Sequence, residues 1–211
     1  MNKKTRIGLN GLGRIGRHIF KMCIDDPKIN LVGINEINPD INNWAYTLNY
    51  DSIYGQSKYR SIVEDGNLIC NQKSIFTSIQ KDIRNVPWDK WGVDIVIDSS
   101  GVLENTEKCK QLIKSRFKKK VIFTNSPDNV DFTLVLGVNE KEYKHDKHHL
   151  ISSSICDATA IAPVSKVIDE LFNIKLGYVT TLHPWLSYQN LMDGPSSSWS
   201  VPGEVYHHYA L

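Results

Sequence analysis

Apolar and polar positions at the start of the chain follow the order of a strand, a turn and a helix. Residues 7–9 form an apolar run, a glycine-rich segment follows at 10–17, and residues 15–23 carry apolar positions at helical spacing. A second apolar run follows at 31–35. Because strand and helix periods alternate in this way, we predict a βαβ unit over residues 5–37.

Short apolar runs separated by turn residues continue beyond this unit. Asp65-Gly66 between apolar pairs at 62–63 and 68–69 predicts a β-hairpin. The same pattern predicts further strands at 94–99, 121–124 and 133–136, and a helix at 106–114. Helices and strands therefore alternate, which predicts an α/β fold with a doubly wound, mostly parallel sheet of Rossmann type.

The pattern changes near His148. A strand predicted at 151–154 leads into a helix at 156–172, and another strand is predicted at 176–183. Two strands and one helix cannot bury a sheet face by themselves. We therefore expect a first domain over residues 1–154, followed over 155–211 by the incomplete start of an α+β domain.

Composition narrows the class of protein. The chain has 211 residues, 41% of them hydrophobic, and a net charge of +2, which points to neither nucleic acid nor a membrane as partner. The basic run 116–120 favours a solvated helix end over a nucleic-acid patch. No apolar segment has the length of a membrane span or the character of a signal peptide, so we expect a cytoplasmic protein.

Cysteine and histidine spacing gives no sign of a metal. The four cysteines contain no C-x-x-C pair, so neither a zinc site nor a disulfide framework is indicated. The histidines at 145, 148 and 149 cluster with lysines in a predicted surface turn. We expect reduced thiols and no metal site.

The glycine-rich segment carries the clearest chemical signal. Gly11, Gly13 and Gly16 fit G-x-G-x-x-G between a strand and a helix, where a pyrophosphate can meet the helix N-terminus. Glu36 ends the second strand twenty residues after Gly16, where a carboxylate can bind ribose hydroxyls. A structural turn with an incidental acid is the alternative. The βαβ context favours dinucleotide binding, and the carboxylate favours NAD over NADP because it repels a 2′-phosphate.

A candidate nucleophile follows the predicted strand at 151–154. Cys156 opens a helix, where the helix dipole favours thiolate, although a buried structural thiol is also common at such a junction. His183 ends the strand predicted at 176–183. A right-handed crossover between the two strands would bring Cys156 and His183 to one edge, facing the dinucleotide. A Cys–His pair beside a nicotinamide can oxidise an aldehyde through a thioester.

Together these residues resemble the glyceraldehyde-3-phosphate dehydrogenase family over nearly the whole chain. Beyond the glycine motif, the resemblance rests on Tyr50-Asp51-Ser52 with Gly55, Asp98-Ser99-Ser100-Gly101, Gly137-Val138-Asn139, Ala162-Pro163, Thr180-Thr181-Leu182-His183 and Asp193-Gly194-Pro195. It implies Cys156 and His183 as catalytic residues and a homotetramer for a full-length chain. It also implies cofactor contacts from Asn10, Gly11, Gly13, Arg14, Ile15, Gly16, Glu36, Ser100, Gly101 and Thr124.

The chain departs from the family where substrate phosphate would bind. The family has hydroxyl side chains on both sides of the cysteine, whereas this chain has Ile155 and Asp157. Two phosphate-binding threonines of the family correspond to Leu186 and Tyr188. An acid in a first helical turn is also a normal cap, but capping accounts for Asp157 alone.

Three functions are compatible with this pattern. The favoured one is NAD-dependent oxidation of a small-molecule aldehyde other than the family's usual substrate. The second is an ordinary phosphorylating glyceraldehyde-3-phosphate dehydrogenase with an altered site. The third is a nucleotide-binding remnant without catalysis, which the short second domain would favour.

Overall fold

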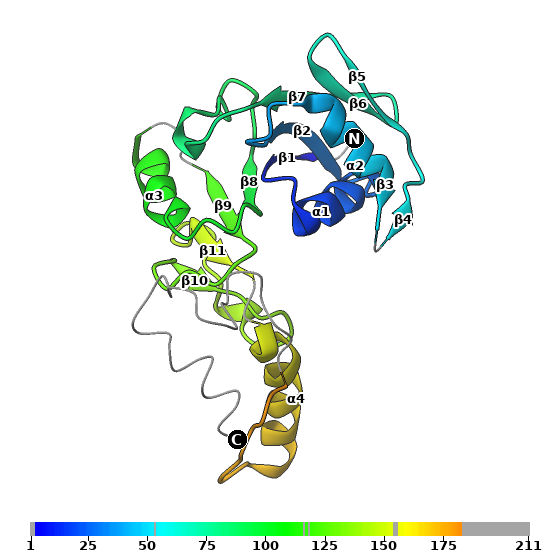
Figure 1. The fold of residues 1–211 in the computed structure, drawn as a ribbon. Coiled ribbons are helices and arrows are strands. Elements are labelled where there is room, and N and C mark those ends of the chain that lie inside the picture. The colour runs from blue at the N-terminus through cyan, green and yellow to red at the C-terminus, as the bar shows by residue number, and fades with distance from the viewer. Residues whose placement is uncertain (1–2, 53, 116, 118, 154–155, 183–211) are drawn as a thin grey trace, which may run out of the picture. The chain divides into compact units, whose positions relative to one another are not determined.

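The computed structural model describes residues 3–52, 54–115, 117, 119–153 and 156–182 (Figure 1). The chain divides into two compact units between Pro163 and Val164. In the first unit, the described residues contain one sheet of nine strands, in the order β10-β11-β9-β8-β1-β2-β7-β6-β5. The strands from β10 to β7 are parallel, whereas β6 and β5 are antiparallel.

The element bounds are as follows. The strands of the sheet are β1 (Thr5–Asn10), β2 (Ile29–Asn35), β5 (Ser61–Glu64), β6 (Asn67–Cys70), β7 (Lys73–Ser78), β8 (Ile95–Asp98), β9 (Lys120–Phe123), β10 (Phe132–Thr133) and β11 (Leu150–Ser152). A separate ribbon pairs β3 (Tyr50–Asp51) with β4 (Gly55–Gln56). The helices are α1 (Arg14–Asp25), α2 (Ile41–Asn49), α3 (Asn105–Ser115) and α4 (Cys156–Phe172), with short 3-10 turns at Ile83–Asn85 and Glu140–Glu142.

The sheet confirms the predicted fold class. Consecutive residues of β2 enter different cores: Leu31 packs in a cluster with Phe20 of α1, and Val32 packs in a cluster with Leu112 of α3. Successive side chains of a strand point to opposite faces, so both faces of the sheet are covered, as in a doubly wound fold. The predicted hairpin is also confirmed, because Asp65 (φ 46°) and Gly66 (φ 74°) both have the positive φ typical of a type I′ turn.

The strand predicted at 133–136 is wrong beyond Thr133. The side chain of Asn139 accepts a hydrogen bond from Val135 N–H at 2.9 Å and donates one to Thr133 C=O at 2.9 Å. Leu134 N–H still donates to Ser152 C=O of β11 at 2.8 Å, so the two groups that Asn139 binds lie on the side of β10 away from β11. The chain therefore turns instead of extending, and Val138 N–H bonds back to Val135 C=O.

The strand predicted at 176–183 is also wrong for its described part. Residues 173–182 have no regular secondary structure, and Tyr178 and Leu182 are 92% and 96% exposed. A strand needs a neighbour for its N–H and C=O groups, but β11 already has β10 on one side and β9 on the other. The crossover that we expected to join Cys156 to His183 is therefore absent from the described residues, and His183 lies outside them.

Burial of Cys23 predicts a loss of stability in alkaline solution. Burial, assisted by the charge of Asp26 and opposed by that of Lys73, raises the pKa of this thiol from 9.0 to about 11. The unfolded chain therefore releases the proton first, so the contribution to stability is present below pH 9 and is lost as the pH rises through 11. That shift corresponds to about 2–3 kcal/mol. Urea unfolding between pH 8 and 11 should show a shallower decline in Cys23→Ala, and an equal decline in both proteins would contradict the prediction.

Candidate dinucleotide and catalytic site

The glycine turn joins β1 to α1, and its backbone segments are closely packed. Gly11 has a φ of 91°, which L side chains rarely adopt, and its N–H donates to Asn35 C=O at 2.8 Å. A Cβ on Gly16 would lie 2.1 Å from Gly11 C=O. Only hydrogen at position 16 lets the helix start this close to the strand.

The N-terminus of α1 is open to a ligand. Its N-cap residue, Gly13, makes no side-chain capping bond, and the first turn contains no acidic residue. A Cβ on Gly13 would meet nothing within 4 Å, and Arg14 and Ile15 are exposed. The unsatisfied N–H groups of this turn therefore fit the pyrophosphate of a dinucleotide.

Buried polar side chains close the carboxyl ends of β1, β2 and β8. Asn10 donates to Asp98 Oδ1 at 2.9 Å and accepts from Asn35 Nδ2 at 2.7 Å, while Asn105 donates to Asp98 Oδ2 at 3.0 Å. All four side chains are at most 4% exposed. The order of strands along the chain reverses between β1 and β8, where ligands bind in open α/β sheets. This network holds the strand ends at that point.

The predicted residues that follow β8 and β9 lie at the same edge. Ser100 N–H donates to Asp98 Oδ1 at 3.1 Å, and Thr124 N–H donates to Asp98 C=O at 3.0 Å. Gly101 follows with a φ of 74°. Asp98 therefore connects the segments that contain Asn10, Ser100 and Thr124.

Glu36 reaches across to the glycine turn. Its Oε2 accepts from Leu12 N–H at 2.5 Å, and its Oε1 accepts from Ile37 N–H at 2.8 Å and Asn38 N–H at 3.3 Å. A carboxylate offers about four acceptor positions. Groups of the described residues use three of them, which leaves one on Oε2 for a ribose hydroxyl beside the turn.

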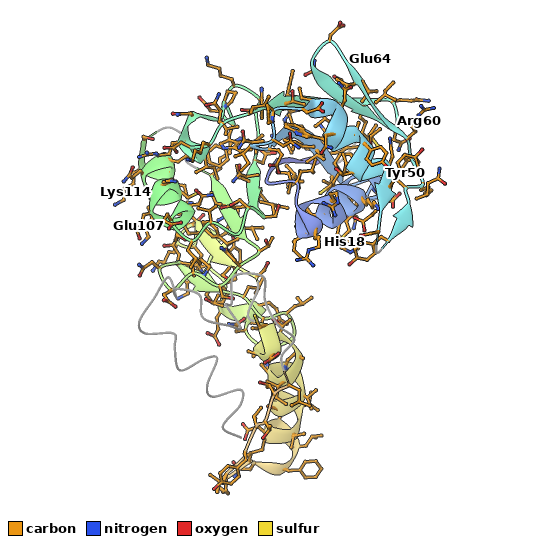
Figure 2. All side chains as sticks on the ribbon, in the orientation of Figure 1. His18, Tyr50, Arg60, Glu64, Glu107 and Lys114 are labelled. Carbon is orange, nitrogen blue, oxygen red and sulfur yellow. The ribbon has the colours of Figure 1, made fainter. Side chains whose placement is uncertain are left out.

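A ribbon after α2 is attached to the side of α1. Arg17 Nε donates to Asp51 Oδ2 at 3.0 Å, and Asp51 Oδ1 accepts from Tyr54 N–H at 3.1 Å. The ring of His18, which projects from α1 in Figure 2, stacks on Tyr54 with 4.7 Å between centroids. These contacts connect the Tyr50-Asp51-Ser52 segment to the helix that begins at the glycine turn.

The candidate nucleophile differs in exposure from the other thiols. Cys156 is exposed as the first residue of α4, whereas Cys23, Cys70 and Cys109 are buried. Burial raises the pKa of Cys70 and of Cys109, with Asp98 and Asp82 raising that of Cys109 further. Asp157 is half-buried in the first turn of α4. The other predicted residues of this part, Ile155, His183, Leu186 and Tyr188, lie outside the described residues.

Cys156 follows a strand that ends at the carboxyl edge of the sheet, where the glycine turn also lies. β11 is parallel to β9, with Ser152 paired to Phe123, and Ser152 Oγ donates to Asn125 C=O at 2.8 Å. The carboxyl end of β11 is therefore at the edge that carries Thr124. Cys156 follows four residues later in the chain.

Comparison with known proteins identifies the family. Residues 5–106 match the family model described as glyceraldehyde 3-phosphate dehydrogenase, NAD binding domain, and residues 155–201 match the C-terminal domain model of the same family. The chain belongs to the glyceraldehyde-3-phosphate dehydrogenase family. NAD is the cofactor of the first of these two domains, and the open helix N-terminus and Glu36 fit it.

Individual glyceraldehyde-3-phosphate dehydrogenases agree with this assignment. The chain is 36% identical over 191 residues to the protein of Geobacillus stearothermophilus, covering 90% of this chain and 56% of that one. It is 39% identical over 193 residues to the protein of Cochliobolus heterostrophus, and the match covers 92% of this chain and 56% of that protein. It is 34% identical over 195 residues to glyceraldehyde-3-phosphate dehydrogenase 1 of Bacillus subtilis, and the match covers 92% of this chain and 58% of that protein. The chain thus spans little more than half the length of these relatives.

The sequence analysis did not predict several of the buried side chains that support the site. Asn35, Asp98 and Asn105 carry the buried network, yet only Asn10 was predicted as a site residue from this set. The available signal was a polar residue at the end of each apolar strand. Among the described residues, no group of three or more His, Cys, Asp or Glu side chains is arranged to hold a metal, and no helix is both long and apolar enough to cross a membrane.

Proposed function

We propose that the protein oxidises an aldehyde with NAD through a thioester on Cys156. The observation that carries this proposal is an exposed cysteine at the start of α4, after a strand that ends at the same sheet edge as the dinucleotide turn. The other three thiols are buried, so they are poor candidates for attack on a substrate.

The first domain would hold NAD at its carboxyl edge. The first-turn N–H groups of α1 would bind the pyrophosphate, and Gly13 leaves room for it to approach. The free acceptor position of Glu36 would take a ribose hydroxyl. Ser100, Gly101 and Thr124 would face the rest of the dinucleotide. When bound, NAD supplies the acceptor for a hydride.

Cys156 would supply the covalent chemistry. Its thiol gives a proton to a base, for which His183 is the proposed group, and the sulfur attacks the aldehyde carbon to form a hemithioacetal. The C=O bond would re-form as a thioester when the hydroxyl gives its proton to that base and the carbon gives up a hydride, for which bound NAD would be the acceptor. Attack by water or phosphate then releases the acid or acyl phosphate and returns the thiol.

The residue types around Cys156 in the sequence support a less anionic aldehyde as the substrate. Asp157 places a carboxylate in the first turn of α4, next to the nucleophile. A nearby substrate phosphate would be repelled, and each lost hydroxyl partner is worth about 1–3 kcal/mol at a desolvated anion. Ile155, Leu186 and Tyr188 stand where the family resemblance implies hydroxyl side chains. We propose water as the acyl acceptor.

Steady-state NADH formation tests this substrate class. Glyceraldehyde should be oxidised at a rate that inorganic phosphate does not raise, and glyceraldehyde 3-phosphate should show a KM higher by at least about tenfold. Asp157→Thr removes the charge and supplies a hydroxyl, so it should lower that KM. Efficient, phosphate-dependent oxidation of glyceraldehyde 3-phosphate would instead indicate the ordinary glycolytic reaction. Tight NAD binding without oxidation of either aldehyde would indicate a non-catalytic protein.

Glu36 should determine the preference for NAD. Glu36→Gln keeps the size of the side chain but removes the charge, so it should reduce the ratio of NAD to NADP affinity by about tenfold. Isothermal calorimetry with both dinucleotides is the measurement. Glu64→Gln makes the same change at the tip of the β5–β6 hairpin, where Figure 2 labels Glu64, and should leave the ratio unaltered. Equal ratios in the two variants would contradict the assignment.

We propose a cytoplasmic protein that forms a homotetramer at full length, and a division of the chain into an NAD-binding domain over 1–154 and a partial catalytic domain over 155–211. Sedimentation velocity tests the oligomeric state directly.

A further inference from the structure

A basic hollow lies at the opposite edge of the sheet from the dinucleotide turn. It has a volume of about 620 Å³ and lies at the amino ends of β1, β8 and β9. Because these strands are parallel, the hollow and the glycine turn are separated by the length of the strands. Its charged lining residues are Lys3, Lys4, Lys119, Lys120, Asp94 and Asp146, accompanied by two imidazoles.

The charges of the lining residues do not balance. Lys119 is paired with Asp94, with 3.0 Å between Nζ and Oδ1. Burial acts to raise the pKa of Asp94, but hydrogen bonds from Lys119 and Arg6 N–H and the charges of Lys119 and Lys3 outweigh it and lower the pKa. Asp94 is thus ionised and committed to its partner. Asp146 is the other lining acid, so four lysines against two aspartates leave two positive charges uncompensated.

Lys120 contributes one of these charges from a buried position. It is 9% exposed, and its Nζ donates to His145 C=O at 2.5 Å and His148 C=O at 2.9 Å. The ring of Tyr143 lies 5.3 Å from the same nitrogen. Within the described residues no carboxylate pairs with Lys120, so carbonyl dipoles and a ring stabilise a full charge at the wall of the hollow. Two carbonyl bonds leave the third ammonium proton available.

We infer that this hollow binds the phosphate group of a small phosphorylated molecule. A phosphate monoester carries close to two negative charges at neutral pH, which matches the uncompensated charge of the lining. Lysine binds phosphate as a point charge, and Lys3 and Lys4 are exposed and can approach it from the rim. The volume falls within the 300–1,000 Å³ typical of small-molecule pockets and exceeds what a bare phosphate ion fills.

Titration followed by amide NMR tests the inference, with NAD at saturation to fill the carboxyl-edge site. Inorganic phosphate and ribose 5-phosphate are the probes, at constant ionic strength. Either should shift the amides of Lys3, Lys4, Lys120 and His149 and leave those of residues 11–16 unchanged. Ribose 5-phosphate binding at least tenfold tighter than inorganic phosphate supports an organic phosphate. Equal affinities would overturn that part and leave a site for the free ion.

Charge variants make the test specific. Lys3→Ala combined with Lys4→Ala should weaken ribose 5-phosphate at least tenfold, and Asp146→Asn should tighten it. Lys58→Ala combined with Lys81→Ala removes the same charge from exposed positions outside the hollow and should change affinity less than twofold. Absence of binding, or equal weakening in the two double variants, would overturn the inference.

Discussion

Replacing Cys156 with serine is expected to lower NADH formation by on the order of 10³-fold or more, because a serine hydroxyl beside the same base is a far weaker nucleophile than a thiolate. The side chain is exposed and packs in neither buried cluster, so the free energy of unfolding should change by less than about 0.5 kcal/mol. The measurement is steady-state NADH absorbance with glyceraldehyde, together with calorimetric NAD affinity.

The matched control removes a different thiol. Cys23→Ala deletes a buried sulfur of α1 and should retain turnover within about threefold, although it will be less stable. NAD affinity should be the same in both variants. Substantial NADH formation by Cys156→Ser would rule out the thioester route.

Gly16→Ala is expected to have the largest effect on the fold of the first domain. Its Cβ would lie 2.1 Å from the carbonyl oxygen of Gly11 and 2.8 Å from Ser99 Oγ, closer than nonbonded atoms approach. The helix must move away from the strand end, and such overpacking costs about 1–3 kcal/mol or more. Urea unfolding should show this loss, and NAD affinity should fall at least about tenfold because the first-turn N–H groups move with the helix.

Gly13→Ala separates the two effects. The position has a φ of −67°, and a Cβ there meets nothing within 4 Å, so the protein should keep its stability. A bound pyrophosphate would contact the added methyl group, so NAD affinity should still fall. If Gly13→Ala bound NAD as tightly as the unaltered protein, the pyrophosphate would not lie over this turn.

Local sequence patterns predicted the elements whose structure depends on local chemistry. The apolar run 7–9 before the glycine turn lies in β1, and the helical pattern at 15–23 lies in α1. Asp65-Gly66 forms the predicted turn between β5 and β6. The failures depend on which groups bind the backbone of a segment, and apolar periodicity does not reveal them. Strand β10 ends early because Asn139 captures the backbone of Thr133 and Val135. Residues 176–182 are rich in β-forming side chains, but within the described part of the chain they pair with no strand, and β11, the expected partner, already has a neighbour on each side.

The buried network shows a second limit of sequence patterns. Asn10, Asn35 and Asp98 each follow an apolar run, which a turn would also explain, and only the strand order brings them together. Asn105 comes from a helix, and no spacing connects it to Asp98. By contrast, Glu36 was predicted from its distance to Gly16, because a βαβ unit has a narrow range of lengths.

The central claim is that a substrate acyl group is carried on Cys156, and a rapid-quench experiment tests it directly. The protein is mixed with glyceraldehyde and NAD, quenched in acid, digested and analysed by mass spectrometry. The account predicts an acyl adduct on the peptide containing Cys156 that appears with NADH, requires NAD, and is absent from peptides containing Cys23, Cys70 or Cys109. NADH formation without an adduct on Cys156, or an NAD-dependent adduct on another cysteine, would contradict the account.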